Sequence, residues 1–137
     1  MKVFLGGTTA NSKWRDEIEP MLDEARIVYF NPVVEDWNED AQKNELYERE
    51  NSDFCLYTIT PKMEGVFSVA EVADDSNKRP EKTILVVLES DEGAKFSSAQ
   101  KKSLDAVAKM VEKNGAKAFG DLKSAVAWMR KIKMLLR

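Results

Sequence analysis

Carboxylates are the side chains best suited to carry chemistry in this chain, because its 137 residues include no histidine. A Ser-His-Asp triad, a Cys-His dyad and a histidine metal site are therefore excluded within the chain. An acid, base or nucleophile must come from Asp, Glu, Lys, Tyr, Ser or the single cysteine, Cys55. Because Cys55 lies inside an apolar run, it is interpreted as part of a strand core. The sequence predicts a carboxylate enzyme without a metal or a cofactor.

Glu71 is the carboxylate whose position most favours a catalytic role. It lies near the start of a helix predicted over about residues 69–76, which follows a buried strand predicted over 54–59. A carboxylate at this end of a sheet can attack an anomeric carbon. However, the run from Ser68 to Glu71 has the Ser-x-x-Glu spacing of a capping box, in which the glutamate only closes the start of the helix. Both interpretations stay open at this level.

A glycine pair follows the first apolar run and is the second candidate feature. Gly6 and Gly7 would let the backbone approach a ligand closely, and Thr8 adds a hydroxyl group. A helix that starts after this loop would favour an anion at its N-terminus. The segment matches neither the dinucleotide fingerprint nor a phosphate-binding P-loop. A simple tight turn is an equally good interpretation of the pair.

Polar residues after the second apolar run form the third candidate. Asn31, Asp36 and Trp37 could line a pocket for a base or a sugar. The alternative is an Asx-type turn followed by a helix cap at Asp36 or Asn38. The sequence alone favours this structural alternative.

Apolar runs alternate five times with segments of helical periodicity. This alternation predicts the strands and helices that hold the candidate residues in place. The expected strands lie at 3–5, 27–30, 54–59, 83–88 and 116–119. Such an alternation predicts a doubly wound α/β domain of the flavodoxin or Rossmann type, with a five-stranded parallel sheet and helices on both faces. Ligands of these sheets bind outside the carboxyl ends of the strands. Residues 1–137 are expected to form one domain, because no linker or repeat interrupts them.

The composition of the chain limits the kinds of binding partner and the cellular location that are expected. The formal net charge of −3 gives no reason to expect binding to nucleic acid or to an anionic membrane. The apolar stretch at the N-terminus is too short for a signal peptide or a membrane span. One unpaired cysteine fits a reducing compartment, so a cytoplasmic location is expected.

Taken together, four blocks resemble the nucleoside 2-deoxyribosyltransferase-like family over about residues 3–88. The first is the opening strand with Gly6-Gly7-Thr8 and the residues Trp14 and Arg15 behind it. The others are Asn31-Pro32 with Asp36-Trp37, then Glu45 with Ser52-Asp53, and finally the helix that contains Glu71 with the valine-rich strand after it.

The resemblance implies a mechanism and a set of roles. Glu71 would attack C1′ of a 2′-deoxynucleoside or its 5′-monophosphate, and Glu45 or Glu64 would protonate the leaving base. A second base or water would then release the sugar from the enzyme. The implied substrate contacts are Gly6, Gly7, Thr8, Asn31, Asp36, Trp37, Gly65 and Ser68. A homodimer or larger homo-oligomer is also implied. The alternative is a module of the same fold that binds a nucleotide, or another partner, without catalysis.

Overall fold

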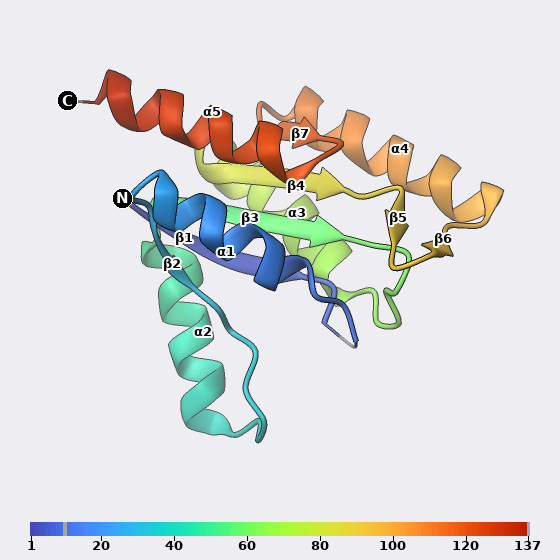
Figure 1. Ribbon diagram of the computed structural model, residues 1–137, viewed down its shortest axis with the longest axis horizontal. Helices are drawn as coiled ribbons and strands as arrows, with labels where there is room; N and C mark the ends of the chain where they lie inside the picture. Colours follow the sequence, from blue (N-terminus) through green and yellow to red (C-terminus); the bar gives the residue numbers. More distant parts are fainter. Residues whose placement is uncertain (10, 137) are drawn as a thin grey trace.

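Five parallel strands form the central sheet of the computed structural model, which describes residues 1–9 and 11–136 (Figure 1). The strands are β1 (Lys2–Gly7), β2 (Val28–Phe30), β3 (Phe54–Ile59), β4 (Thr83–Val87) and β7 (Lys117–Phe119). They lie in the order β2-β1-β3-β4-β7, and every neighbouring pair is parallel. This is the doubly wound α/β fold that the alternation predicts. The strand order reverses between β1 and β3, which is where such folds bind ligands.

Helices cover both faces of the sheet. The helices α1 (Trp14–Glu24) and α5 (Leu122–Leu135) pack on one face, and α3 (Phe67–Lys78) and α4 (Ser98–Lys113) pack on the other. Side chains alternate between the two cores along each strand, so Leu56 faces α1 and α5 while Tyr57 faces α3 and α4. Both are fully buried. The short 3₁₀ turn Pro80–Lys82 leads into β4.

Several boundaries differ from the sequence prediction. Gly6 and Gly7 are the last residues of β1 and pair with β3, so they extend the strand and do not stop it. Pro20 lies within α1, which continues through it, although a proline inside a helix commonly kinks or interrupts it. A small hairpin of β5 (Ser90–Asp91) and β6 (Ala94–Lys95) was not predicted. A capping box at Ser97 closes the start of α4, and the Asp121 side chain caps α5.

Residues 31–51, here called the arm, leave the sheet between β2 and β3 and end in α2 (Glu39–Asn51). Figure 1 shows α2 projecting away from the rest of the molecule. Asn38 caps this helix by accepting a hydrogen bond from the Ala41 amide. No residue of α2 belongs to either hydrophobic core, and its one leucine, Leu46, is half exposed. The arm is therefore attached by something other than a hydrophobic core.

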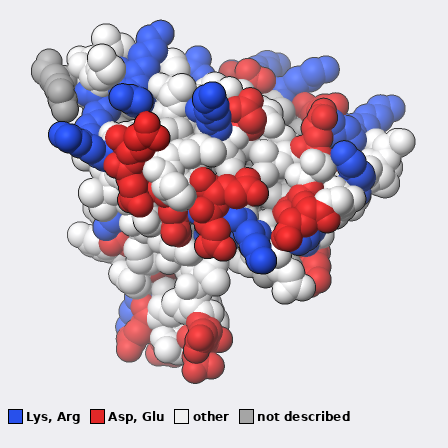
Figure 2. All heavy atoms as spheres, viewed as in Figure 1, with Lys and Arg blue, Asp and Glu red and all other residues white. Residues whose placement is uncertain are grey.

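Acidic and basic side chains are interspersed on the face of the molecule that Figure 2 shows, and no large area of one sign dominates it. Within residues 1–9 and 11–136, no helix has the length and apolar character needed to cross a membrane.

Candidate active site

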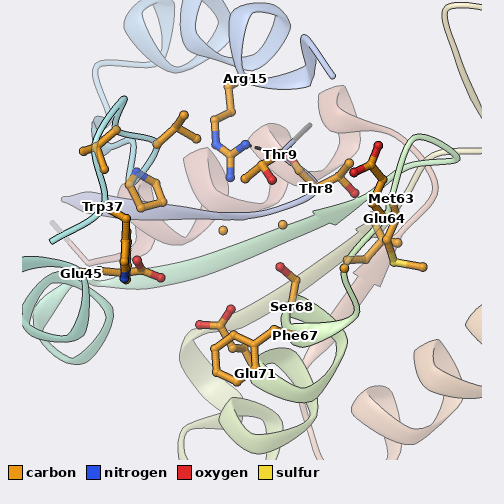
Figure 3. Close-up of a pocket in the computed structure, with 17 residues that line it drawn as sticks. Thr8, Thr9, Arg15, Trp37, Glu45, Met63, Glu64, Phe67, Ser68 and Glu71 are labelled. Atoms are coloured by element: carbon orange, nitrogen blue, oxygen red, sulfur yellow. Dashed lines mark hydrogen bonds between the residues drawn. The ribbon is translucent and has the colours of Figure 1, made fainter. Parts of the chain in front are cut away.

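A cavity of about 470 Å³ opens at the carboxyl ends of β1 and β3, where the strand order reverses. Its volume is within the range of about 300–1,000 Å³ that is usual for small-molecule pockets. Its walls come from the end of β1, the arm, the loop after β3 and the start of α3 (Figure 3). The lining includes nine of the eleven residues predicted for the site: Gly6, Gly7, Thr8, Trp37, Glu45, Glu64, Gly65, Ser68 and Glu71.

The end of β1 lies too close to β3 for any side chain larger than hydrogen. A Cβ atom on Gly7 would stand 2.1 Å from the Thr58 carbonyl oxygen, and the φ angle of Gly7 is +120°. A Cβ atom on Gly6 would stand 2.7 Å from the ring of Tyr57. These contacts explain the glycine pair better than a tight turn does, because both residues are still in the strand. They also leave bare backbone at the cavity wall.

Hydrogen bonds hold Thr8, the first residue after β1, in place. The Thr8 hydroxyl accepts a hydrogen bond from the Thr60 amide at 3.0 Å, and the Thr8 amide donates to the Thr58 carbonyl. The Trp14 indole and an Arg15 amino group each donate to the Thr8 carbonyl at 2.8 Å. The Thr8 backbone is therefore fixed from both sides.

Arg15 also lines the cavity, although sequence reasoning did not assign it to the site. Its guanidinium is buried and donates to the carbonyl oxygens of Leu5 and Thr8. Burial lowers the pKa of Arg15 to about 10, while the charges of Glu19 and Glu45 act in the opposite direction. The sequence does contain a signal that Arg15 is buried. It precedes the apolar residue Ile18 by three positions, which places both on the same side of α1.

Glu71 lies in the second turn of α3, and its side chain points into the cavity (Figure 3). The capping-box interpretation of this residue is wrong. The helix begins at Phe67 after Val66 and has no side-chain cap, so Ser68 is already inside it. The Glu71 carboxylate accepts no hydrogen bond within the described residues. Its oxygens are thus left free on the cavity side.

Burial makes the Glu71 carboxyl a weaker acid than an ordinary glutamate. The pKa of its carboxyl is raised from 4.5 to about 7, chiefly because the group is removed from water. Arg49 opposes this effect, and the negative charges of Glu45 and Asp75 add to it. About half of the Glu71 side chains would be ionised near neutral pH. Perturbed carboxyl groups in clefts are typical of functional sites.

The two predicted proton donors lie in different settings. Glu45 is half-buried on α2, and its pKa is raised mainly by burial. Figure 3 shows it on the same side of the cavity as Trp37. Its charge acts on Glu71. Glu64 lies on the exposed loop after β3, and Figure 3 shows it beside Met63 on the other side of the cavity. Within the described residues, no group of acidic or cysteine side chains is arranged to hold a metal ion.

Two predicted contacts, Asn31 and Asp36, are not part of the cavity lining. The Asn31 side-chain oxygen accepts a hydrogen bond from the Val33 amide at 3.0 Å, which is the Asx-type turn expected as the alternative. The apolar residues that follow it, Pro32, Val33 and Val34, line the cavity instead.

Comparison with known proteins agrees with this architecture. The family model described as "Nucleoside 2-deoxyribosyltransferase like" matches residues 1–91, a segment that runs from β1 through β5 and includes every residue lining the cavity. No curated protein sequence matches the chain. The match covers more than half of the chain and confirms the resemblance found in the sequence: the chain belongs to the nucleoside 2-deoxyribosyltransferase-like family.

Proposed function

We propose that this protein cleaves the N-glycosidic bond of a 2′-deoxynucleoside or its 5′-monophosphate through a covalent intermediate on Glu71. The observation that carries the proposal is a buried carboxylate, free of hydrogen bonds within the described residues, facing a ligand-sized cavity at the strand-order reversal. A second carboxyl, Glu45, lies close enough to influence it. Family membership supports this reaction class.

The first step would be attack by a Glu71 carboxylate oxygen on C1′. A new C–O bond forms, the bond from C1′ to the base nitrogen breaks, and its electron pair leaves with the base. The base takes a proton from a carboxylic acid as it leaves. Glu45 suits this role better than Glu64, because its raised pKa keeps the proton on the acid at higher pH. Positive charge that develops on the sugar is stabilised by the nearby carboxylates.

The second step would reverse the first. Glu45, now a carboxylate, removes a proton from a second base or from water as it attacks C1′, and the bond to Glu71 breaks. Two inversions retain the configuration at C1′. The acceptor decides whether the protein acts as a transferase or as a hydrolase.

The remaining cavity residues would hold the sugar and its substituents. The bare backbone at Gly6 and Gly7 leaves room for the sugar, and Trp37 offers an aromatic face to a base. Arg15 and the start of α3 at Ser68 bring positive potential to the same cavity, which would suit a 5′-phosphate.

Base release measured by chromatography tests the proposal. The protein is incubated with deoxynucleosides and their 5′-monophosphates, with and without an acceptor base. We expect Glu71→Ala to reduce release by about 10³-fold or more, since the nucleophile is gone. Glu45→Gln should reduce it by about 10²-fold, and Glu64→Gln, the matched control, by much less.

Each alternative has a distinct outcome. Equal loss in Glu64→Gln and Glu45→Gln would contradict the assignment of the proton donor. Binding of a nucleotide in calorimetry, with no base released from any substrate, would identify a binding module that does not catalyse this reaction.

A further inference from the structure

A row of charged side chains lies next to Glu71 and includes Arg49 and Asp75, which do not line the cavity. One amino group of Arg49 is 3.7 Å from a Glu71 carboxylate oxygen. The same guanidinium donates hydrogen bonds to both carboxylate oxygens of Asp75, at 3.1 Å from Nε and 2.9 Å from Nη2. Arg49 comes from α2 and the two acids come from α3, so the row joins the arm to the helix of the proposed nucleophile.

Asp75 fixes the position of the Arg49 guanidinium. Its carboxylate is completely buried and accepts four hydrogen bonds, two from Arg49, one from the Tyr57 hydroxyl and one from Arg79 Nε. A two-pronged contact between a guanidinium and a carboxylate sets the orientation of both groups. Tyr57 belongs to β3, so its hydrogen bond connects Asp75, and through Asp75 the guanidinium of Arg49, to the central sheet.

The contact between Arg49 and Glu71 differs from the contact between Arg49 and Asp75. At 3.7 Å it is an ion pair that lies beyond hydrogen-bond distance, so the guanidinium stabilises the charge without occupying the lone pairs of Glu71. Both side chains are about nine-tenths buried, and a charge pair is screened little in such a setting. This is the arrangement that a nucleophilic carboxylate needs.

Most of the other charges around Glu71 are negative. The charged or titratable groups that face it or line the same cavity are Glu45 and Arg49 from α2, Asp75 from α3, Arg15 from α1, and Glu64 from the loop after β3. Arg15 donates to carbonyl oxygens at the opposite wall of the cavity. Arg49 is thus the cation that directly opposes protonation of Glu71.

We propose that Arg49 is a positioning residue that keeps the Glu71 carboxylate ionised and available at the cavity wall, with Asp75 holding the guanidinium in place. The catalytic part of this inference rests on the proposed function, but the electrostatic part does not. It predicts a property of Glu71 that is measurable in the absence of any substrate.

The test is an NMR titration of the protein labelled with ¹³C at the glutamate side-chain carboxyl carbon, with Glu71→Gln used to assign the signal. Arg49→Gln should raise the pKa of Glu71 by about one unit or more, a tenfold change in proton affinity. Arg49→Lys, which retains the charge, should restore much of the difference. Arg79→Gln is the matched control, since Arg79 also binds Asp75 but has no ion pair with Glu71.

A Glu71 pKa that moves no more in Arg49→Gln than in Arg79→Gln would overturn the proposal. If the glutamine variant does not fold, the same titration is carried out on Arg49→Met, which keeps a long aliphatic side chain. In an active wild type, the acidic limb of kcat/KM should move upward with the pKa in Arg49→Gln. If the wild type releases no base, the proposed function fails, and the titration still decides the role of Arg49.

Discussion

The two sides of the cavity are built in contrasting ways. On one side, Gly7, Thr8 and Glu71 are buried against the sheet and the helices that cover it. On the other side, the arm contributes Trp37 and Glu45 from a segment whose helix has no residue in either hydrophobic core. The first wall is buried with the sheet, whereas the second stands outside the hydrophobic core.

Charges, and not apolar contacts, attach the arm to the body. Arg49 binds Asp75, Glu48 forms an ion pair with Lys2 at 2.6 Å, and Lys82 donates to the Glu50 carbonyl. All of these contacts lie in the last turn of α2, which leaves the remainder of the helix without comparable support. Segments with few buried contacts open at low free energy. The proposed nucleophile is thus fixed by packing, and the proposed proton donor is carried on the less stable wall.

A pair of leucine substitutions gives the largest expected difference in stability between the buried sheet and the arm. Leu56→Ala empties a fully buried position in β3 and should lower the free energy of unfolding by about 2–5 kcal/mol. Leu46→Ala, at the half-exposed position in α2, should change it by less than about 0.5 kcal/mol. Urea denaturation measures both. Similar losses would mean that the arm is part of the cooperative core.

A pair of glycine substitutions sharpens the contrast within the cavity lining. Gly7→Ala forces a side chain against the Thr58 carbonyl at a positive φ angle and should destabilise the protein by about 3 kcal/mol. Gly65→Ala adds a methyl group in open space and should change stability by less than about 0.5 kcal/mol. Thermal unfolding distinguishes them, and a tolerated Gly7→Ala would contradict the close approach of β1 to β3.

The smallest expected effect is on the free energy of unfolding, which is lowered when Glu71 is ionised in its buried position. A carboxyl whose pKa rises from 4.5 to about 7 on folding favours the folded state fully below pH 4.5, and this contribution is lost as the pH rises through 7. Glu71→Gln lacks this loss, so at pH 8 it should be more stable than the wild type, by at most about 3 kcal/mol, and near pH 4 the gap should close.

Denaturation at a series of pH values checks that prediction, with Glu64→Gln on the exposed loop as a control for the loss of a carboxylate. A constant difference between Glu71→Gln and the wild type across the pH range would show that the charge of Glu71 is not destabilising.

The sequence predicts the buried wall well because that wall depends on periodic patterns. Apolar runs place the strands, the alternation of strands and helices sets their parallel arrangement, and Glu71 follows from its place after β3. The glycine pair was expected to end β1 and instead completes it. Local composition alone does not reveal that difference, since the reason is the proximity of Thr58 and Tyr57 on another strand.

The arm was harder to predict because no hydrophobic period governs it. Asn31 and Asp36 have suitable side chains but lie outside the cavity lining, whereas Val33 and Val34 line it. Arg49 was missed because its partner Asp75 is 26 residues away and the pairing depends on the position of α2. The spacing of Glu45 and Arg49, one turn apart on one face of a helix, is the only local signal for this group.

The exposed arm also has an evolutionary consequence. Residues such as Val33, Val34 and Trp37 line the cavity without supporting the core, so substitutions there carry little penalty for folding. Mutations that alter the shape of this wall can therefore accumulate while the fold and Glu71 stay intact. In this protein, ligand preference is free to diverge separately from the architecture that holds the proposed nucleophile.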